Sequence, residues 1–402
     1  MEPGQFAFVV VANRLPVDAA TDDDGTIVWR RSPGGLVAAL EPVLGARGGA
    51  WVGWPGAPGL DLEPFETDGI AVVPVPLSEA DVADYYEGFA NATIWPLYHD
   101  VIRPPEYHRE WAECFRTVNR RFALAAAKAA APGATVWVHD YQLQLVPRML
   151  RALRPDVKIG FFLHIPFPGV DLFSQLPWRG EILEGLTGAD LIGFQRSGDA
   201  SNFRRSVRRL LGWPVRGDAI DVASVTGTRR ARAQAFPISI DFAAIDAIAH
   251  RPDVQRRAVE IREELGHPRT VFLGADRLDY TKGIRHRLKA FGELVASGAL
   301  EVPGAILVQV ASPTRDNVVA YQDLQEDVAT TVGQINGDLA ALSQVAVQYL
   351  HQSQSFEEMV ALYLAADVLL VTALRDGMNL VAKEYVAARP DLGGVEVLSE
   401  FA

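Results

Sequence analysis

Residues 368–388 read VLLVTALRDGMNLVAKEYVAA. The apolar run Val368–Thr372 predicts a buried parallel strand, and the good helix formers and spaced apolar residues of Asn379–Ala388 predict a helix. The loop between them places Asp376 at the carboxyl end of the strand, where open α/β sheets bind their ligands. The start of the helix can bind an anion, and Glu384 adds a second carboxylate. For this segment alone, a ligand clamp and an ordinary acidic surface loop both remain open.

The preceding segments repeat this strand–loop–helix plan. Thr270–Ala275 is predicted to be an apolar strand, and the loop DRLDYTKGI at residues 276–284 carries Arg277 and Lys282 on either side of a turn. Two cations at the carboxyl end of a strand suit a pyrophosphate, although a pair of surface cations would give the same pattern. Further strands of this second series are predicted at Ala305–Val310, Val345–Leu350 and Gly394–Leu398.

Apolar strands in the first part of the chain also end in polar residues. These strands are predicted at Phe6–Ala12, Thr135–Tyr141, Lys158–Leu163 and Asp190–Gln195. Arg14, His139, Asp140 and His164 lie at or just beyond their carboxyl ends. This pattern is typical of an α/β protein with doubly wound domains and a ligand cleft along one edge. A single histidine is more often structural, but the recurrence at equivalent strand ends favours a functional site. Metal ligation is disfavoured, because the clustered spacing and the third carboxylate are missing.

The two series imply two domains. Phe236–Asp241 is predicted to be the linker strand, so we place an N-terminal domain at residues 1–235 and a C-terminal domain at 236–402. The last predicted strand is followed only by a few residues up to Ala402. A sheet strand with nothing packed back on it is unusual, so we expect the second domain to be truncated at its C terminus.

The composition narrows the class of protein. The chain has 402 residues, 49% of them hydrophobic, and a net charge of −12, which argues against a nucleic-acid binder that neutralises phosphates. The single cysteine, Cys114, excludes an intrachain disulfide framework and fits a reducing cytosol, so we expect a cytoplasmic protein. No apolar run reaches the length of a membrane span, and Phe6–Ala12 is interpreted as the first strand and not as a signal peptide.

Two further segments are candidates for ligand contact. Gly34 and Gly35 precede a predicted helix at Val37–Leu44 and allow close approach of the backbone to a ligand, although the pair lacks the GxGxxG spacing. A predicted helix at Asp81–Phe89 leads into a region that is dense in aromatic residues. The aromatic residues of this helix and region are Tyr85, Tyr86, Phe89, Trp95 and Tyr98, and an earlier segment carries Trp51 and Trp54. Aromatic residues at this density are most often core, but one or two could line a sugar-binding pocket.

Several separated segments together match one family. The segments that carry the match are Ala12–Pro16, Gly34–Leu36, Trp51–Trp54, His139–Tyr141, Phe162–Pro168, Asp276–Gly283 and Leu374–Ala387. In register over nearly the whole chain, they resemble the trehalose-6-phosphate synthases of glycosyltransferase family 20. The resemblance implies a GT-B fold, with two Rossmann-like doubly wound domains that face each other across a cleft. It also implies an enzyme that moves glucose from a nucleotide diphosphate glucose to glucose 6-phosphate.

The resemblance assigns the donor to the C-terminal domain. Arg277 and Lys282 would hold the pyrophosphate and balance the charge of the departing nucleotide. The N–H groups of Leu380 and Val381 would add contacts to the phosphates, and Gly34 and Gly35 would approach them as a mobile loop. The remaining donor contacts are to the two sugars: Glu384 to the ribose, Asp376 to the transferred glucose, and His164 near its anomeric carbon.

The acceptor residues lie mainly in the N-terminal domain. The phosphate of glucose 6-phosphate would be bound by Arg14, Tyr86 and, from across the cleft, Arg315, and its sugar by Trp95 and Asp140, with one of Trp51 or Trp54 as a further wall. The resemblance implies a front-face displacement with retention, in which the leaving phosphate oxygen accepts the acceptor's proton. It implies no cofactor and no bound metal, and we expect a homo-oligomer with UDP- or GDP-glucose as donor, no nucleic acid and no membrane partner.

Two alternatives remain on the same fold. One is a pseudo-glycosyltransferase that couples a nucleotide-activated cyclitol to an amino-cyclitol phosphate, and the other is a non-catalytic sensor of sugar phosphates. The sequence departs from the family pattern at Ala12, where serine is common, and at Gln142, where histidine often follows the His-Asp-Tyr motif. Neither change removes a proposed ligand group. Family members also continue for several more helices, which bears on domain closure.

Overall fold

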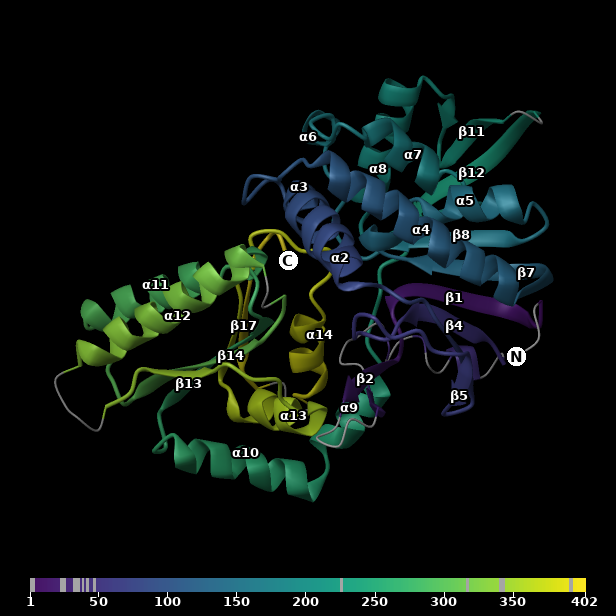
Figure 1. Ribbon diagram of the computed structural model, residues 1–402. Helices are drawn as coiled ribbons and strands as arrows, with labels where there is room; N and C mark the ends of the chain where they lie inside the picture. Colours follow the sequence, from purple (N-terminus) through teal and green to yellow (C-terminus); the bar gives the residue numbers. More distant parts are fainter. Residues whose placement is uncertain are drawn as a thin grey trace. The chain divides into compact units, whose positions relative to one another are not determined.

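The computed structural model describes residues 4–402 except 22–26, 32–36, 38–39, 41–42, 46–47, 225–226, 316–317, 340–343 and 390–392. The chain divides into two compact units, Met1–Pro237 and Ile238–Ala402 (Figure 1). The predicted boundary at 235/236 lies two residues before this division. The predicted linker strand at Phe236–Asp241 is wrong, since this segment has no strand pairing. Gly34, Gly35 and half of the predicted helix at Val37–Leu44 lie outside the described residues, and Val37, Leu40, Val43 and Leu44 are helical as predicted.

The first unit is built on a ten-stranded sheet within the described residues. Its strands are β1 (Phe6–Arg14), β4 (Ala50–Trp54), β5 (Phe65–Thr67), β6 (Ile70–Pro74), β7 (Ala130–His139), β8 (Lys158–Leu163), β9 (Leu191–Phe194), β10 (Val215–Arg216), β11 (Ala219–Ser224) and β12 (Gly227–Ala235). Their spatial order is β10-β11-β12-β9-β8-β7-β1-β4-β6-β5. The strands from β12 to β6 in this order are parallel, and β10, β11 and β5 pair antiparallel at the two edges.

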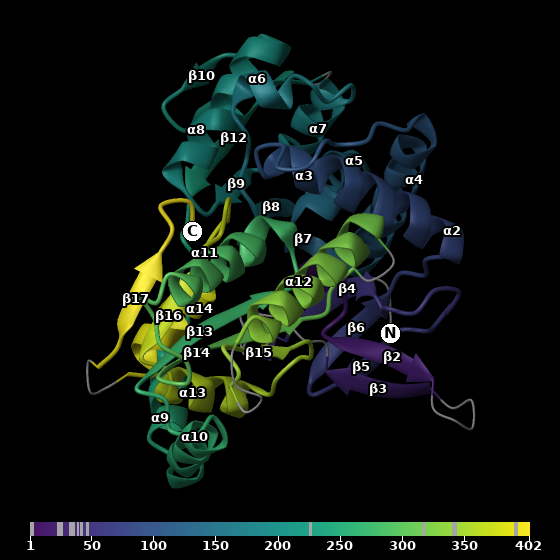
Figure 2. The same ribbon diagram turned by 90° about the vertical axis from the view of Figure 1, so that its left-hand side faces the viewer.

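The strand order of the first sheet reverses between β1 and β7. From β1 the chain proceeds outward through β4 and β6, whereas β7, β8 and β9 follow one another in the opposite direction. Crevices for ligands in open α/β sheets form at such a reversal, outside the carboxyl ends of the strands. Strand β1 is longer than the strand predicted at Phe6–Ala12, because it continues through Asn13 and Arg14. A separate hairpin follows it, formed by β2 (Val17–Thr21) and β3 (Ile27–Arg31) (Figure 2).

Helices cover the first sheet. They are α2 (Glu79–Asp81), η1 (Val82–Ile94), α3 (Trp95–Tyr98), α4 (Arg109–Ala129), η2 (Tyr141–Leu143), α5 (Val146–Leu153), α6 (Val170–Phe173), α7 (Arg179–Leu186), α8 (Ser197–Ser206) and η3 (Val207–Leu211). The predicted helix at Asp81–Phe89 belongs to a longer helical stretch, in which η1 has π-helical hydrogen bonding. A capping box between Ser78 and Asp81 starts this stretch. The aromatic region is therefore helical as far as Tyr98, beyond the predicted end.

The second unit has a five-stranded, wholly parallel sheet in the order β15-β14-β13-β16-β17. Its strands are β13 (Thr270–Arg277), β14 (Ala305–Ser312), β15 (Val347–Leu350), β16 (Val368–Val371) and β17 (Val395–Leu398). The strand order reverses between β13 and β16, which are neighbours with Phe272 opposite Val368. The loops that follow these two strands, 278–283 and 372–379, therefore emerge side by side at the reversal.

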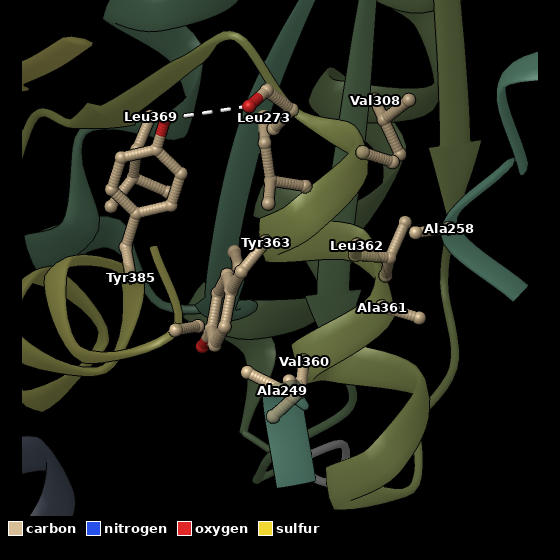
Figure 3. Packing of buried hydrophobic residues seen from close by; sticks show 14 of the residues in the cluster. Ala249, Ala258, Leu273, Val308, Val360, Ala361, Leu362, Tyr363, Leu369 and Tyr385 are labelled. Carbon is tan, nitrogen blue, oxygen red and sulfur yellow. Dashed lines mark hydrogen bonds between the residues drawn. The ribbon is translucent and has the colours of Figure 1, made fainter. Parts of the chain in front are cut away.

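Helices cover both faces of the second sheet. They are α9 (Phe242–Ala249), α10 (Pro252–Glu264), η4 (Tyr280–Lys282), α11 (Ile284–Ala296), α12 (Val319–Gly337), α13 (Phe356–Ala365) and α14 (Leu380–Ala387). One core packs α11 and α12, which lie side by side, against the sheet (Figures 1 and 2). The other core contains side chains of α9, α10, α13 and α14 (Figure 3). Both units are thus Rossmann-like layers of helices on a mainly parallel sheet. Among the described residues, no helix is long and apolar enough to cross a membrane.

Candidate active site

The two loops at the reversal of the second sheet are joined by hydrogen bonds. The N–H of Leu374 donates to the carbonyl of Thr281 at 2.7 Å, and the hydroxyl of Thr372 lies 3.3 Å from the carbonyl of Lys282. Gly283 has φ +66°, and a Cβ there would lie 2.2 Å from the carbonyl oxygen of Thr372. Only glycine fits this combination of positive φ and close approach. The predicted pyrophosphate loop is therefore packed directly against the loop that carries Asp376.

Lys282 and Asp376 form an ion pair at the junction of these loops. The Nζ of Lys282 lies 2.5 Å from Oδ2 of Asp376, and the two side chains are only 13% and 12% exposed. The carboxylate also accepts from the N–H of Gly377 at 2.9 Å and from the side-chain amide of Asn379 at 3.3 Å. The structure thus brings together two residues that the sequence placed 94 positions apart. Arg277 is exposed at the end of β13, five residues before Lys282.

A second ion pair lies beneath the first and was not predicted. Asp276 and Arg287 are almost completely buried, with Oδ2 and Nη2 2.8 Å apart. Arg287 also donates to Gln309 at 2.8 Å and to Thr372 at 3.1 Å. Burial raises the pKa of Asp276, and the nearby Arg287 and Lys282 oppose this effect. Gly274 makes room for this arginine, since a Cβ there would lie 2.1 Å from Nη1 of Arg287.

The third ion pair involves Arg315, a predicted acceptor residue. Its Nη1 lies 2.8 Å from Oδ2 of Asp279, and both side chains are buried. The hydroxyl of Tyr321 donates to the same carboxylate oxygen at 3.0 Å and also contacts Arg315. The other oxygen of Asp279 caps the short helix η4 through the N–H of Thr281. The guanidinium of Arg315 is therefore held inside the second unit by a carboxylate.

Helix α14 begins at the end of the second loop. Asn379 caps it by accepting from the N–H of Ala382 at 3.0 Å, so Leu380 and Val381 occupy its first turn. Glu384 lies one turn further along, and its Oε2 accepts from the hydroxyl of Tyr363 at 2.8 Å. Burial raises the pKa of Glu384, and this hydrogen bond works in the opposite direction.

Arg14 lies at the carboxyl end of β1 in the first unit. Its guanidinium lies 2.7 Å from the carboxylate of Asp18 and stacks 4.7 Å above the ring of Trp54. Tyr86 is the next ring, 6.0 Å from Trp54 between centroids. Gly56, at φ +90°, leaves room for Arg14, since a Cβ there would clash with Nη2. The predicted Arg14 and Tyr86 therefore both lie next to Trp54.

His139, Asp140 and His164 meet at the ends of β7 and β8. Nδ1 of His139 lies 3.1 Å from Nε2 of His164. The backbone N–H of His164 donates to the carboxylate of Asp140 at 3.1 Å. Burial lowers the pKa of both imidazoles, and the neighbouring ring of His164 lowers that of His139 further. Asp140 has φ +72°, an uncommon conformation for a residue with a side chain. Both histidines are therefore neutral at pH 7.

Trp95 is mostly core. It is 4% exposed and packs against His99 and Tyr141, with ring centroids 4.2 and 5.4 Å away. Trp51 is fully buried and donates to the carbonyl of Arg14 at 2.9 Å, so Trp54 is the member of that pair next to the Arg14 side chain. Among the residues that the structure describes, His, Cys, Asp and Glu side chains nowhere gather in a group of three that could hold a metal ion.

Comparison with known proteins gives the family. The sequence profile of glycosyltransferase family 20 matches residues 7–402. The chain belongs to glycosyltransferase family 20. Family membership makes the protein a glycosyltransferase of the trehalose-6-phosphate synthase family. The trehalose-6-phosphate synthase of Mycolicibacterium gilvum is 58% identical over 405 residues, which are 98% of this chain and 80% of that protein.

Solved structures agree with this family and with its GT-B fold. A UDP-forming α,α-trehalose-phosphate synthase of Burkholderia xenovorans in complex with glucose 6-phosphate has a TM-score of 0.87 and 32% identity, over 98% of this chain and 85% of that one. The E. coli trehalose-6-phosphate protein bound with UDP-2-fluoro glucose also has a TM-score of 0.87 and 32% identity, over 98% of this chain and 84% of that one. The predicted fold class and family are confirmed.

Proposed function

We propose that this chain transfers glucose from UDP- or GDP-glucose to glucose 6-phosphate and forms α,α-trehalose 6-phosphate with retention. The observation that carries the proposal is the Lys282–Asp376 pair at the reversal of the second sheet, with Arg277 exposed at the end of the strand that leads into the same loop. Cations and a carboxylate within one loop junction suit a ligand that joins a pyrophosphate to a sugar. The complexes of the Burkholderia and E. coli proteins, with glucose 6-phosphate and a UDP-glucose analogue, support the same pair of substrates.

The donor contacts are proposed in the second unit. Arg277 and Lys282 bind the pyrophosphate, and the first-turn amides of Leu380 and Val381 add hydrogen-bond donors at a positive helix end. Asp376 then accepts hydrogen bonds from hydroxyls of the transferred glucose, because its Lys282 partner turns toward the phosphates. Glu384 binds the ribose. In the first unit, Gly34 and Gly35 are proposed to approach the phosphates and His164 to contact the glucose.

The acceptor contacts are proposed mainly in the first unit. Arg14 and Tyr86 bind the phosphate of glucose 6-phosphate, with Arg14 already supported by Asp18 and Trp54. Trp95 and Asp140 bind its sugar. Arg315 of the second unit is a further phosphate ligand, and its proposed role requires the phosphate to compete with Asp279 for the guanidinium.

The proposed chemistry needs no carboxylate nucleophile. The bond between the anomeric carbon of glucose and the phosphate oxygen breaks, and the acceptor's O1 forms the new bond on the same face. The proton of that O1 hydroxyl moves to the leaving phosphate oxygen, which completes the nucleoside diphosphate. Arg277 and Lys282 stabilise the negative charge that develops on the diphosphate, which is electrostatic stabilisation of the transition state. The neutral imidazole of His164 offers a hydrogen bond to the sugar without adding a charge.

A donor panel tests the proposal. UDP-, GDP- and ADP-glucose are each incubated with glucose 6-phosphate, and the product is isolated and its two anomeric configurations are determined by NMR. We expect α,α-trehalose 6-phosphate from the UDP or GDP donor. Lys282→Met should abolish product formation, whereas Lys289→Met, which removes an exposed lysine of α11, should not. Absence of a disaccharide phosphate with every donor, despite binding of both substrates, would favour the sensor, and a β-linked product would exclude retention.

A further inference from the structure

The carboxylate of Glu384 has a partner in the core of the second unit. Tyr363 is 1% exposed and comes from α13, and its hydroxyl donates to Oε2 of Glu384 at 2.8 Å. Tyr363 belongs to this apolar core together with Leu273, Val360 and Tyr385 (Figure 3). A ring packed on all sides holds its hydroxyl in one place. The hydrogen bond therefore fixes the rotamer of a side chain that is itself only partly buried.

The same bond also affects the charge of Glu384. A phenol donates more strongly to a carboxylate than to a carboxylic acid, so the bond favours the ionised form. Burial acts in the opposite direction and raises the pKa of Glu384. A carboxylate has lone pairs for several hydrogen bonds, so one bond from Tyr363 leaves acceptor capacity for two ligand hydroxyls.

The cations nearest to Glu384 in the sequence, Lys383 and Arg389, donate to backbone carbonyls. Lys383 donates to the carbonyl of Ile238 at 2.8 Å, and Arg389 donates to backbone carbonyls that include Tyr363 at 3.2 Å. Asp276, at the end of β13, is near enough to raise the pKa of Tyr363, as does Glu384 itself, after the larger effect of burial. Tyr363 is therefore a neutral donor at pH 7.

We propose that Tyr363 is a positioning residue for the nucleotide, which holds the Glu384 carboxylate ionised and oriented toward the two ribose hydroxyls. This inference rests on the proposed function, in which Glu384 binds the ribose. The structure supplies a matched comparison in Tyr385, which belongs to the same core with its ring 6.3 Å from that of Tyr363 (Figure 3). The hydroxyl of Tyr385 is directed at the backbone carbonyls of Ala366 and Asp367 and not at a carboxylate.

The test compares Tyr363→Phe with Tyr385→Phe. Isothermal titration with UDP, or with GDP if the donor panel selects guanine, gives the dissociation constant between about pH 5.5 and 8. We expect Tyr363→Phe to weaken binding at pH 7 about tenfold, a loss of about 1.4 kcal/mol. Without the hydroxyl the pKa of Glu384 rises further, so affinity should be lost at a higher pH on acidification than in the wild type. Tyr385→Phe should match the wild type in affinity and in pH dependence.

A second ligand separates positioning from general damage. The 2′,3′-dideoxy nucleoside diphosphate lacks the hydroxyls that Glu384 is proposed to bind, so wild type and Tyr363→Phe should bind it equally. Equal weakening of both ligands, or a wild-type affinity and pH profile in Tyr363→Phe, would overturn the positioning role. Glu384→Gln tests the underlying assignment independently. If that variant binds the ordinary diphosphate like the wild type, the ribose contact of the proposed function fails, and the inference fails with it.

Discussion

The strand ends of the two units differ in their chemistry. All eight tryptophans lie in residues 1–237 and none in 238–402, and the strand ends of the first unit present aromatic rings and two neutral imidazoles. The strand ends of the second unit present three ion pairs, built on Asp276, Asp279 and Asp376. The strand ends of the first unit suit sugar hydroxyls and ring faces, with Arg14 as the proposed ligand of the acceptor phosphate, and those of the second unit suit a diphosphate.

This difference concerns the groups that neutralise each cation before a ligand binds. Bringing an unpaired charge out of water costs several kcal/mol, so a buried cation needs a carboxylate before any ligand arrives. Lys282 and Arg315 have such partners, whereas Arg14 of the first unit is 39% exposed and is supported by a ring as well as by Asp18.

The largest effect is expected at Arg277, an exposed cation at the end of β13. Arg277→Ala should lower kcat by about 10³-fold or more, which corresponds to about 4 kcal/mol, because the developing charge on the diphosphate loses a partner. The fold should persist, since the side chain is exposed. Steady-state kinetics with a saturating acceptor measure this effect. Arg285→Ala removes an equally charged but 62% exposed residue of α11 and should keep wild-type kinetics. Equal turnover in the two variants would contradict the pyrophosphate assignment.

Helix α11 offers a comparison of a buried and an exposed ion pair. Arg287→Met should lower the free energy of unfolding by about 3–5 kcal/mol, because it leaves Asp276 buried without its cation. Arg285→Met breaks the exposed pair with Asp327 and should cost less than about 1 kcal/mol. Urea unfolding followed by circular dichroism measures both. Since Asp276 already has a raised pKa, the Arg287→Met deficit should shrink as the pH falls and the carboxyl protonates. A deficit of the same size in both variants would show that burial of the pair does not matter.

The contrast also explains what the sequence could predict. Buried parallel strands are continuous apolar runs, so β8 was predicted with the bounds that the structure has, and β13, β16 and β17 within two residues. Because ligands of open sheets bind at strand ends, the same runs pointed to Arg14, His164, Lys282 and Asp376 as candidates. Their binding roles remain predictions, but their clustering within each unit follows from the topology.

The interactions that hold the candidates could not be predicted. An arginine in an amphipathic helix is normally solvated, and nothing in the sequence of α11 indicates that Arg287 points into the core while Arg285 points out. Tyr363 has the pattern of an ordinary core residue, and its carboxylate partner lies 21 positions away on another helix. Such pairings depend on tertiary contacts. The π-helical geometry of Val82–Ile94 likewise has no simple sequence rule.

Two glycines in one loop test the first unit. In Gly56→Ala, the new Cβ would displace the guanidinium of Arg14, so we expect the KM for glucose 6-phosphate to rise about tenfold, or about 1.4 kcal/mol, with a smaller change in kcat. Gly59→Ala is the control, because Gly59 also has a positive φ but no atom lies within 4 Å of the position that a Cβ would take there. Both variants share the backbone strain of about 1–2 kcal/mol. An equal rise in KM would mean that strain, and not the position of Arg14, controls acceptor binding.

A pH dependence is expected of the imidazole pair of the first unit. Since burial lowers the folded-state pKa of His139 and His164, their contribution to stability is complete above the unfolded value of about 6.5 and is lost as the pH falls below it. Each histidine should lower the free energy of unfolding by up to about 1.4 kcal/mol per pH unit over that window. Tryptophan fluorescence reports this unit alone, because the second unit has no tryptophan.

His139→Asn tests this pH dependence. The amide can still contact Nε2 of His164 but does not titrate. The change in unfolding free energy per pH unit between about pH 6.5 and 5.5 should therefore fall by about 1.4 kcal/mol, the contribution of one proton. Val138→Ala, on the opposite face of β7, should instead lower stability by the same amount at every pH, because it removes only buried apolar surface. A wild-type slope in His139→Asn would mean that His139 takes up its proton in the folded state as readily as in the unfolded chain. In that case the neutral imidazole surface of the first unit, and with it the contrast to the charged second unit, would not hold.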